Sequence, residues 1–163
     1  MSLSNLMVFR HAKSSWDHET LSDHQRPLNA RGRRAAKTIG MVLRARKLMP
    51  DLVWSSDSQR TRETVVRAFG EDVKTEFLPS LYHASANTIL SMCAEHGEPK
   101  CERFCLVGHN PGFEDLIYYL SGTPRRMPTG TCAVFKRTDS ESDWLSPQSW
   151  HLQSYLKPRD FED

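Results

Sequence analysis

The chain has 163 residues, enough to bury one substantial core, and we therefore expect a single domain over residues 1–163. Hydrophobic residues make up 38% and charged residues 26%, which excludes a disordered, collagen-like or disulfide-scaffold protein. The 22 basic and 20 acidic residues nearly balance at a net charge of +2, which argues against a general nucleic-acid binder, so any polyanion must be recognised locally.

Short apolar runs and helical periodicity alternate through the first half of the chain. Strands are predicted at Leu6–Phe9, Leu52–Trp54 and Val73–Leu78. The segment Arg31–Lys47 has apolar residues at helical spacing and is predicted to be a helix. A second helix is predicted to follow the cap residues Ser55–Ser58. Its buried face is expected to consist of Val65, Val66 and Phe69.

The second half of the chain continues the alternation. The predicted elements are a helix between Ser85 and Gly97, a strand at Phe104–Val107, a helix that ends at Gly122, and strands at Thr131–Lys136 and Trp150–Leu156. For the helix that ends at Gly122, Asn110 is predicted to be the N-cap and Pro111 the first residue. The last two strands are expected to form an antiparallel hairpin. This order predicts an α/β fold, a three-layer sandwich with a mostly parallel central sheet, helices on both faces and an antiparallel edge strand.

The cysteines and the apolar runs indicate the setting of the protein. Cys93, Cys101, Cys105 and Cys132 are expected to be reduced thiols in a cytoplasmic protein, because the N-terminus lacks a secretory signal pattern. Cys101 and Cys105 have no second ligand pair, so a zinc site is not expected. No apolar run approaches the ~18 residues that a membrane span requires. We expect no metal, no other cofactor, no membrane partner and no nucleic-acid partner.

Chemically active side chains follow three of the predicted strands. The first strand is followed by Arg10 and His11, the second by Ser55, Ser56 and Arg60, and the fourth by Gly108, His109 and Asn110. In an open parallel sheet, ligands bind beyond the carboxyl ends of the strands. Two arginines and two histidines would meet there with no obvious carboxylate among them. Such a cluster suits a phosphate or another oxyanion.

A histidine in this cluster is a candidate nucleophile, because a neutral imidazole can attack phosphorus and form a covalent phosphohistidine. Nearby arginines should lower its pKa and keep it neutral. Either His11 or His109 could attack on this argument alone. We favour His11, since Arg10 precedes it and the polar loop Lys13–Ser15 offers further phosphate donors.

Four motifs stand in order between about Leu6 and Phe135. They are Arg10-His11-Ala12-Lys13-Ser14-Ser15-Trp16, Arg26-Pro27-Leu28-Asn29 with Gly32, Ser55-Ser56 with Arg60, Thr61 and Thr64, and Gly108-His109-Asn110-Pro111-Gly112. Together they resemble the histidine phosphatase superfamily, and more closely its small phosphohistidine phosphatase branch, the SixA type. The resemblance implies a phosphoglycerate mutase-like fold and a metal-independent phosphatase, a hydrolase.

The resemblance also assigns roles by matched position. It implies that His11 takes the phosphoryl group, that Arg10 and Arg60 hold its oxygens, and that His109 completes the pocket. An alternative role for His109 is a structural one, in which it caps its helix.

Further residues are candidates for binding phosphate or substrate. Ser14 and Asp17 match positions where larger relatives place polar contacts to the transferred group. Lys13, Asn110 and His83 are the other candidates. Lys13 could equally be a solvated surface residue, and His83 an exposed loop histidine.

The chain departs from the superfamily pattern in two places. Ala12 replaces the glycine that usually follows the nucleophile, and Pro79–His83 lacks the carboxylate that larger members use as a general acid. A sugar alkoxide needs a proton as it leaves, whereas imidazole, whose conjugate acid has a pKa of about 6.5, leaves phosphorus readily at neutral pH. The missing acid, together with the absence of the inserted cap segments that larger members carry, favours phosphohistidine on a phosphorylated protein as the substrate.

Three alternatives stay open. The substrate could be a small phosphomonoester, with His83 or an outlying carboxylate as the acid. The protein could be a phosphate-binding module that does not turn over. Nucleic-acid binding through Arg31–Lys47 is favoured least, because this basic helix has no interleaved aromatic residues and is typical of a solvated face.

Overall fold

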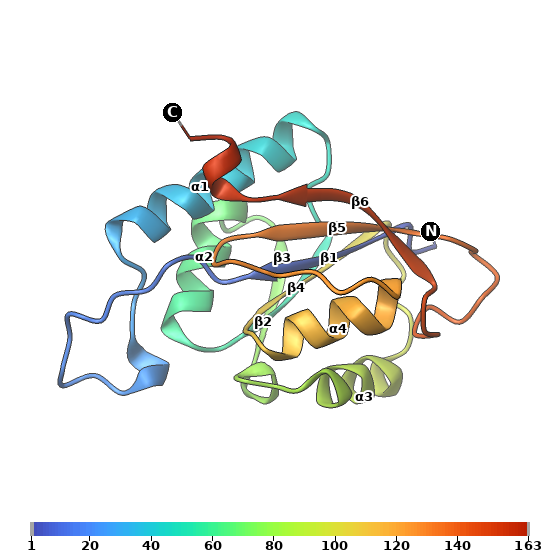
Figure 1. The fold of residues 1–163 in the computed structure, drawn as a ribbon, viewed down its shortest axis with the longest axis horizontal. Helices are drawn as coiled ribbons and strands as arrows, with labels where there is room; N and C mark the ends of the chain where they lie inside the picture. The colour runs from blue at the N-terminus through green and yellow to red at the C-terminus, as the bar shows by residue number, and fades with distance from the viewer. Residues whose placement is uncertain (1, 163) are drawn as a thin grey trace.

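The computed structural model describes residues 2–162, which contain a mixed sheet of six strands. The strands are β1 (Asn5–Arg10), β2 (Leu52–Ser56), β3 (Lys74–Leu78), β4 (Arg103–Gly108), β5 (Cys132–Arg137) and β6 (Trp150–Leu156). Their order across the sheet is β3-β2-β4-β1-β5-β6. The first four are parallel, whereas β5 pairs antiparallel with both β1 and β6. The expected antiparallel hairpin at the edge is confirmed (Figure 1).

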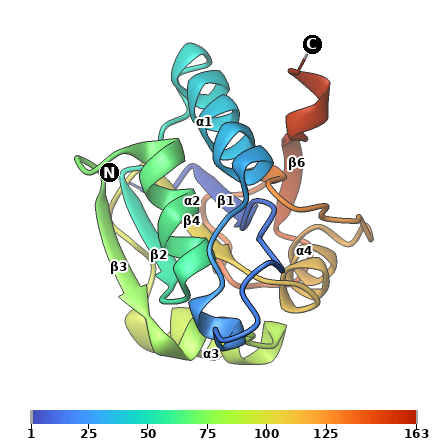
Figure 2. The same cartoon turned by 90° about the vertical axis from the view of Figure 1, so that its left-hand side faces the viewer.

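Two pairs of helices cover the two faces of the sheet (Figures 1 and 2). The first pair is α1 (Ala30–Ala45) and α2 (Gln59–Phe69), and the second pair is α3 (Ala86–His96) and α4 (Gly112–Ser121). Short 3-10 turns lie at Asp23–Gln25, Pro79–Leu81 and Pro158–Asp160. The structure therefore confirms the predicted three-layer α/β sandwich.

The side chains of β1 show why both faces need helices. Met7 and Phe9 belong to the core beneath α1 and α2, whereas Leu6 and Val8 belong to the core beneath α3 and α4. All four are buried, because successive side chains of a strand point to opposite faces. A central parallel strand covered on both sides reads as a continuous apolar run, which is the pattern of this segment.

Polar side chains begin three of the helices. Asn29, Ser58 and Ser85 each accept a hydrogen bond from the backbone N–H three residues further on. The side chain thereby satisfies one of the N–H groups that the first turn of a helix leaves unpaired. The predicted cap regions of α2 and α3 are confirmed.

Two local predictions are wrong. Val66 is 47% exposed, because it lies about 100° around the helix from the buried Val65. The buried residues of α2 are Arg60, Thr61, Thr64, Val65, Ala68 and Phe69. Asn110 does not cap α4, which begins at Gly112 after Pro111. Its amide instead donates to the Met127 carbonyl at 2.9 Å and to Glu114 at 3.2 Å.

The four cysteines are free thiols, as expected. Burial raises the pKa of Cys93 to about 12, so this thiol stays protonated at neutral pH. Within residues 2–162, none of the helices combines the length and the apolar character that crossing a bilayer requires.

The carboxyl ends of β1, β2 and β4 lie at the end of the sheet that faces the viewer in Figure 2, where the loop between β1 and α1 crosses in front of them. This loop packs directly on the start of α1. A Cβ atom at Gly32 would lie 2.0 Å from the Lys13 carbonyl oxygen, so only glycine allows this approach.

Candidate active site

His11 is anchored by the backbone just beyond β1. Its N–H donates to the Gly108 carbonyl at 3.0 Å, and its carbonyl accepts from the Gly130 N–H at 2.8 Å. The first bond joins it to the end of β4 and the second to the loop before β5. A Cβ atom at Gly108 would lie 2.8 Å from the Phe113 ring, which explains the glycine at this strand end.

The His11 ring is held in one tautomer. Nδ1 lies 2.7 Å from the Ala12 carbonyl oxygen, which can only accept a hydrogen bond, so Nδ1 carries the proton and Nε2 keeps its lone pair. The residue as a whole is only 7% exposed. Burial, and then the charges of Arg60 and Arg10, lower the pKa of His11 to about 3, although the bond to Ala12 opposes this shift. His11 is therefore neutral at physiological pH.

His109 lies against His11, with 5.3 Å between the ring centroids. Its Nε2 is 2.9 Å from the Ser56 hydroxyl at the end of β2, and its Nδ1 is buried without a hydrogen-bond partner among the described residues. The side chain thus does not cap a helix. Burial, and then the charges of His11 and Arg60, lower the pKa of His109 to about 2.

The two histidines make stability depend on pH. An unfolded chain protonates them near pH 6.5, whereas the folded chain keeps them neutral to about pH 3 and about pH 2. Between these limits the unfolded state binds more protons, so the free energy of unfolding should fall as the pH falls below 6.5, by up to about 1.4 kcal/mol per pH unit for each histidine.

Urea unfolding at pH 7, 6 and 5 measures this dependence. In the variant His109→Gln, the free energy of unfolding should depend less steeply on pH than in the wild type, whatever the stability of the variant at pH 7. The difference in slope should correspond to the uptake of up to one proton. Equal slopes in the two proteins would mean that His109 titrates normally in the fold.

Arg10 and Asn110 meet at one carbonyl group on the other side of the cleft. Arg10 Nη1 donates to the Met127 carbonyl at 3.0 Å, and the Asn110 amide donates to the same oxygen. Arg10 Nε and Asn110 Oδ1 are buried without partners among the described residues. Burial lowers the pKa of Arg10, and the nearby Glu114 carboxylate opposes this.

Arg60 is almost completely buried at the start of α2, at 2% exposure. Its Nη1 donates to the Asp23 carbonyl at 2.7 Å and its Nη2 to the Asp23 carboxylate at 3.0 Å. The Thr64 hydroxyl links this helix to the nucleophile loop, since it accepts from the Ala12 N–H at 3.0 Å and donates to the Arg60 carbonyl at 2.7 Å.

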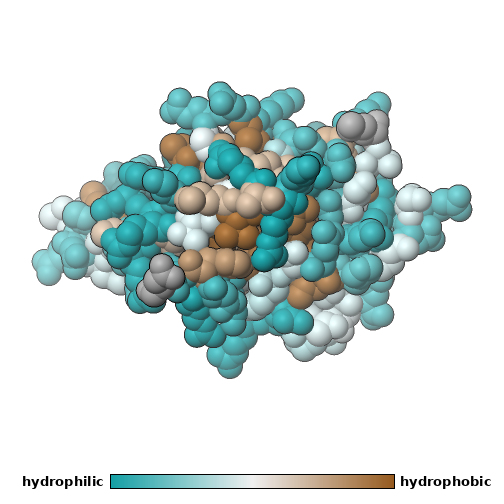
Figure 3. Space-filling view, turned by 90° about the horizontal axis from the view of Figure 1, so that it is seen from above, coloured by the Kyte–Doolittle hydropathy of each residue, from teal (hydrophilic) through white to brown (hydrophobic). Residues whose placement is uncertain are grey.

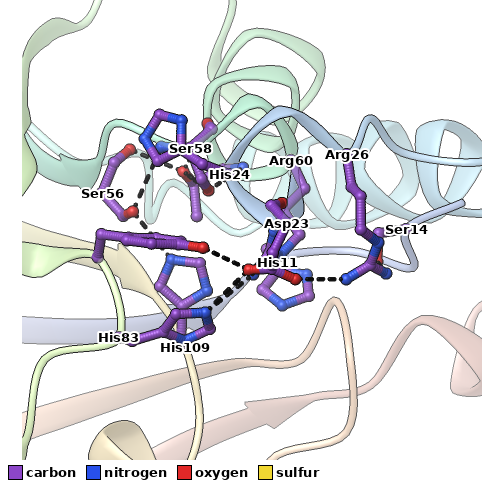
Figure 4. Close-up of polar contacts among 12 residues, drawn as sticks. His11, Ser14, Asp23, His24, Arg26, Ser56, Ser58, Arg60, His83 and His109 are labelled. Atoms are coloured by element: carbon purple, nitrogen blue, oxygen red, sulfur yellow. Dashed lines mark hydrogen bonds and ion pairs between the residues drawn. The ribbon is translucent and has the colours of Figure 1, made fainter. Parts of the chain in front are cut away.

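Asp23 places a carboxylate inside the cluster, which corrects the prediction that none is present. It accepts hydrogen bonds from Arg60, Arg26, His83 and the Tyr82 hydroxyl (Figure 4). Burial raises the pKa of this carboxyl group, but these hydrogen bonds outweigh burial and hold the pKa well below its usual range. Asp23 lies on the 3-10 turn of the β1–α1 loop, which folds back over the strand ends.

The cleft has a volume of about 390 Å³ and gathers most of the predicted site residues. Its lining consists of Arg10, His11, Lys13, Ser14, Trp16, Asp23, Arg26, Arg60, His83, His109, Asn110 and Thr129. Asp17 is not among them; its side chain is exposed and its N–H donates to the Ser15 hydroxyl. Four cations and one carboxylate line the cleft, so its charge favours an anion.

Sequence reasoning missed Arg26, Trp16, Tyr82 and Asp23 as site residues. Arg26 donates to Asp23 at 2.9 Å and also to the Ser14 hydroxyl, and its guanidinium stacks on the exposed Trp16 ring at 3.3 Å. The signal that could have indicated Asp23 and Arg26 was their spacing. An acid and a base three residues apart can pair on one turn.

Known proteins with similar sequences show the family to which this chain belongs. The family model for the histidine phosphatase superfamily (branch 1) matches residues 6–86. An uncharacterised chloroplastic protein of Arabidopsis thaliana is 32% identical over 94% of this chain and 77% of its own length. An uncharacterised protein of Mycobacterium tuberculosis (strain H37Rv) is 32% identical over 92% of this chain and 99% of its own. The chain belongs to the histidine phosphatase superfamily.

Solved structures show which members of the superfamily have a similar fold. The protein of Agrobacterium tumefaciens assigned as the phosphohistidine phosphatase SixA is 28% identical, with a TM-score of 0.80 over 97% of this chain and 100% of that one. Its counterpart from Nakamurella multipartitia is 26% identical, with a TM-score of 0.81 over 95% of this chain and 96% of that one. The protein histidine phosphatase SixA in complex with tungstate shares the fold at 18% identity and a TM-score of 0.75, over 97% and 99%. Within the superfamily, the chain is thus similar to proteins assigned to the SixA type.

Proposed function

We propose that the protein removes the phosphoryl group from phosphohistidine on a protein substrate, through a covalent intermediate on His11. The observation that carries this proposal is the state of the His11 ring. Its Nδ1–H is bound to the Ala12 carbonyl and its pKa is low, so Nε2 offers a lone pair at neutral pH. Arg10, Arg26, Arg60 and His109 line the same cleft.

The reaction has two steps. In the first, the Nε2 lone pair of His11 forms a bond to phosphorus, and the bond from phosphorus to the substrate imidazole breaks. The substrate ring carries a proton from solvent on its other nitrogen, so the nitrogen that keeps the electron pair leaves as part of a neutral imidazole. The phosphorylated His11 ring is cationic, and the Ala12 carbonyl stabilises it through Nδ1–H. In the second step water attacks phosphorus, the bond to Nε2 breaks, and inorganic phosphate and neutral His11 result.

The arginines supply the electrostatic part of the catalysis. Guanidinium groups match phosphoryl oxygens in geometry and charge, and a buried guanidinium acts in a medium that screens it little. Arg60 is the most buried of those in the cleft, and its two terminal nitrogens both face Asp23. We infer that phosphoryl oxygens compete with the Asp23 carboxylate for these donors.

Asp23 does not supply the missing general acid at neutral pH. Its low pKa keeps it ionised, so it has no proton to give to a leaving group. An imidazole leaving group has little need of such an acid, whereas an alkoxide does. The ionised state of Asp23 therefore supports phosphohistidine over a sugar phosphate as the substrate.

A second candidate function is hydrolysis of a small phosphomonoester, with His83 as the proton donor. It is favoured by the position of His83, whose Nε2 lies 3.0 Å from the Asp23 carboxylate and whose ring centroid lies 4.7 Å from that of His109.

Rates on two groups of substrates test the proposal against this alternative. A phosphohistidine-bearing protein should be hydrolysed with a much higher kcat/KM than any member of a panel of sugar phosphates. Faster hydrolysis of one sugar phosphate would favour the second candidate. A protein that binds phosphate but hydrolyses neither group would be a phosphate-binding module.

Replacing Asp23 with asparagine tests the competition for the arginines. We expect Asp23→Asn to bind inorganic phosphate about tenfold more tightly as a competitive inhibitor, because the competing charged acceptor is gone. The matched control is Asp57→Asn, which removes a nearby carboxylate that pairs with His24 at 2.8 Å outside the cleft. Weaker phosphate binding in Asp23→Asn would show that Asp23 positions the arginines instead of competing for them.

Metal independence, the cytoplasmic location and a single domain over residues 1–163 stay predictions. Among the residues that the structure describes, no group of three His, Cys, Asp or Glu side chains is arranged to hold a metal ion. Activity after dialysis against a chelator would test the first of these predictions.

A further inference from the structure

A second cavity, of about 180 Å³, lies beside the catalytic cleft. Lys13 and Thr129 line both, so the two openings adjoin. The other walls come from Arg31 and Ala35 of α1, from Pro128, and from the end of the chain at residues 157–159 and 162. Figure 2 shows the start of α1 and the last turn of the chain on the same side of the molecule.

This cavity is strongly basic. Among the described residues, Lys13, Arg31, Lys157 and Arg159 line it, against a single carboxylate, Glu162. Within residues 2–162, none of these four cations forms an ion pair. They come from three separate segments, and cations that are gathered in this way repel one another unless an anion lies between them.

The cavity is also tied rigidly to the nucleophile. The Gly130 N–H donates to the His11 carbonyl at 2.8 Å, and a Cβ atom at Gly130 would lie 3.0 Å from the Pro158 ring. The Pro158 turn therefore packs on the loop that holds His11. An anion in the cavity would lie at a set position relative to the phosphoryl group in the cleft.

We propose that this basic cavity is a docking subsite for an acidic side chain of the phosphoprotein substrate, from the surface next to its phosphohistidine. The inference rests on the proposed function and adds the surface chemistry of the substrate. A glutamate or aspartate fits the charge of the cavity. The face of the molecule drawn in Figure 3 is mostly hydrophilic and is broken by smaller hydrophobic patches. Charges at the rim of an interface steer association and choose partners, so the subsite should raise kcat/KM for acidic substrates and leave the chemical step unchanged.

Two matched phosphohistidine peptides test the proposal, one with glutamates on both sides of the phosphohistidine and one with glutamines. The test variant is Arg31→Glu with Arg159→Glu, two exposed residues that lie outside the catalytic cleft. A glutamate at position 31 in the first turn of α1 also suits the helix dipole, so the variant should fold. The control is Arg67→Glu with Lys74→Glu. It makes the same charge change at the end of α2 and the start of β3, which lie away from the catalytic cleft.

We expect the wild type and the control to prefer the glutamate peptide by about tenfold in kcat/KM at low salt. The test variant should lose this preference and hydrolyse phosphoimidazole at the wild-type rate. Equal rates on the two peptides in the wild type, or a preference that survives in the test variant, would overturn the proposal.

Binding separates this proposal from the proposed function. If the wild type hydrolyses neither peptide, the proposed function fails. The affinity of the unphosphorylated glutamate peptide for the wild type and for the test variant then decides the subsite alone. Tighter binding to the wild type supports the subsite, and equal binding rejects it.

Discussion

Replacing His11 with alanine should lower kcat on a phosphohistidine substrate by at least about four orders of magnitude, because the variant has no atom that can carry the phosphoryl group. In the wild type, Nε2 of a neutral ring with a bound Nδ1–H is free to attack. Mass spectrometry at neutral to alkaline pH, where P–N bonds survive, should find the phosphoryl group on His11 after brief exposure to substrate.

The control for this experiment is His151→Ala, which removes an exposed histidine of β6 outside the cleft. It should keep wild-type turnover and labelling. A His11→Ala protein that is still labelled on another histidine would move the nucleophile, and His109 would be the first candidate because its ring lies 5.3 Å away. Turnover without any labelled enzyme would argue for direct attack by water.

The variant Arg60→Ala should lose about 100-fold to 1000-fold in kcat/KM, the range expected when one buried donor to a developing charge is removed. The loss should fall mainly on kcat if the guanidinium binds the transferred group more strongly in the transition state. Steady-state kinetics on the phosphohistidine substrate measure both parameters. Arg60→Lys should recover only part of the activity, because an ammonium group cannot make two parallel hydrogen bonds.

Arg62→Ala is the matched control, because Arg62 lies two residues away on the same helix and points elsewhere. Its side chain is exposed, donates to the Asp57 carbonyl at 2.9 Å and lies over the Phe77 ring. Its loss should leave kcat/KM within about twofold of the wild type. A large loss in Arg62→Ala, with near-normal Arg60→Ala, would place the phosphate contact on the other face of α2.

The fold could be predicted because its signals are local. The apolar run of β1, the cap residues of α2 and α3, and the glycine that ends α4 act within a few residues of the positions they specify. The prediction at Val66 was wrong because of helix geometry, since Val66 lies about 100° around α2 from Val65, whereas a tertiary contact decided the result at Asn110. Asn110 is drawn to the Met127 carbonyl, which comes from a distant loop.

The convergence of Arg10, His11, Arg60 and His109 was predicted from the rule that the carboxyl ends of parallel strands share one edge. The structure brings all four to one cleft. The same rule could have found Tyr82, which follows the end of β3 as closely as Arg60 follows the end of β2, but it could not find Asp23, which lies far along the loop between β1 and α1. Asp23 reaches the cleft through an irregular loop, whose path depends on contacts along its whole length.

By itself, the sequence determined the order of strands and helices, the residue types at the strand ends and the resemblance to histidine phosphatases. These properties depend on periodicity, helix caps and short motifs, which can be recognised in a single sequence. Only the tertiary structure decided the tautomer and the low pKa of His11, the carboxylate among the arginines, and the basic cavity beside the cleft. The physical reason is that burial, charge and hydrogen bonding depend on distances between residues far apart in the chain, and such distances exist only in the folded molecule.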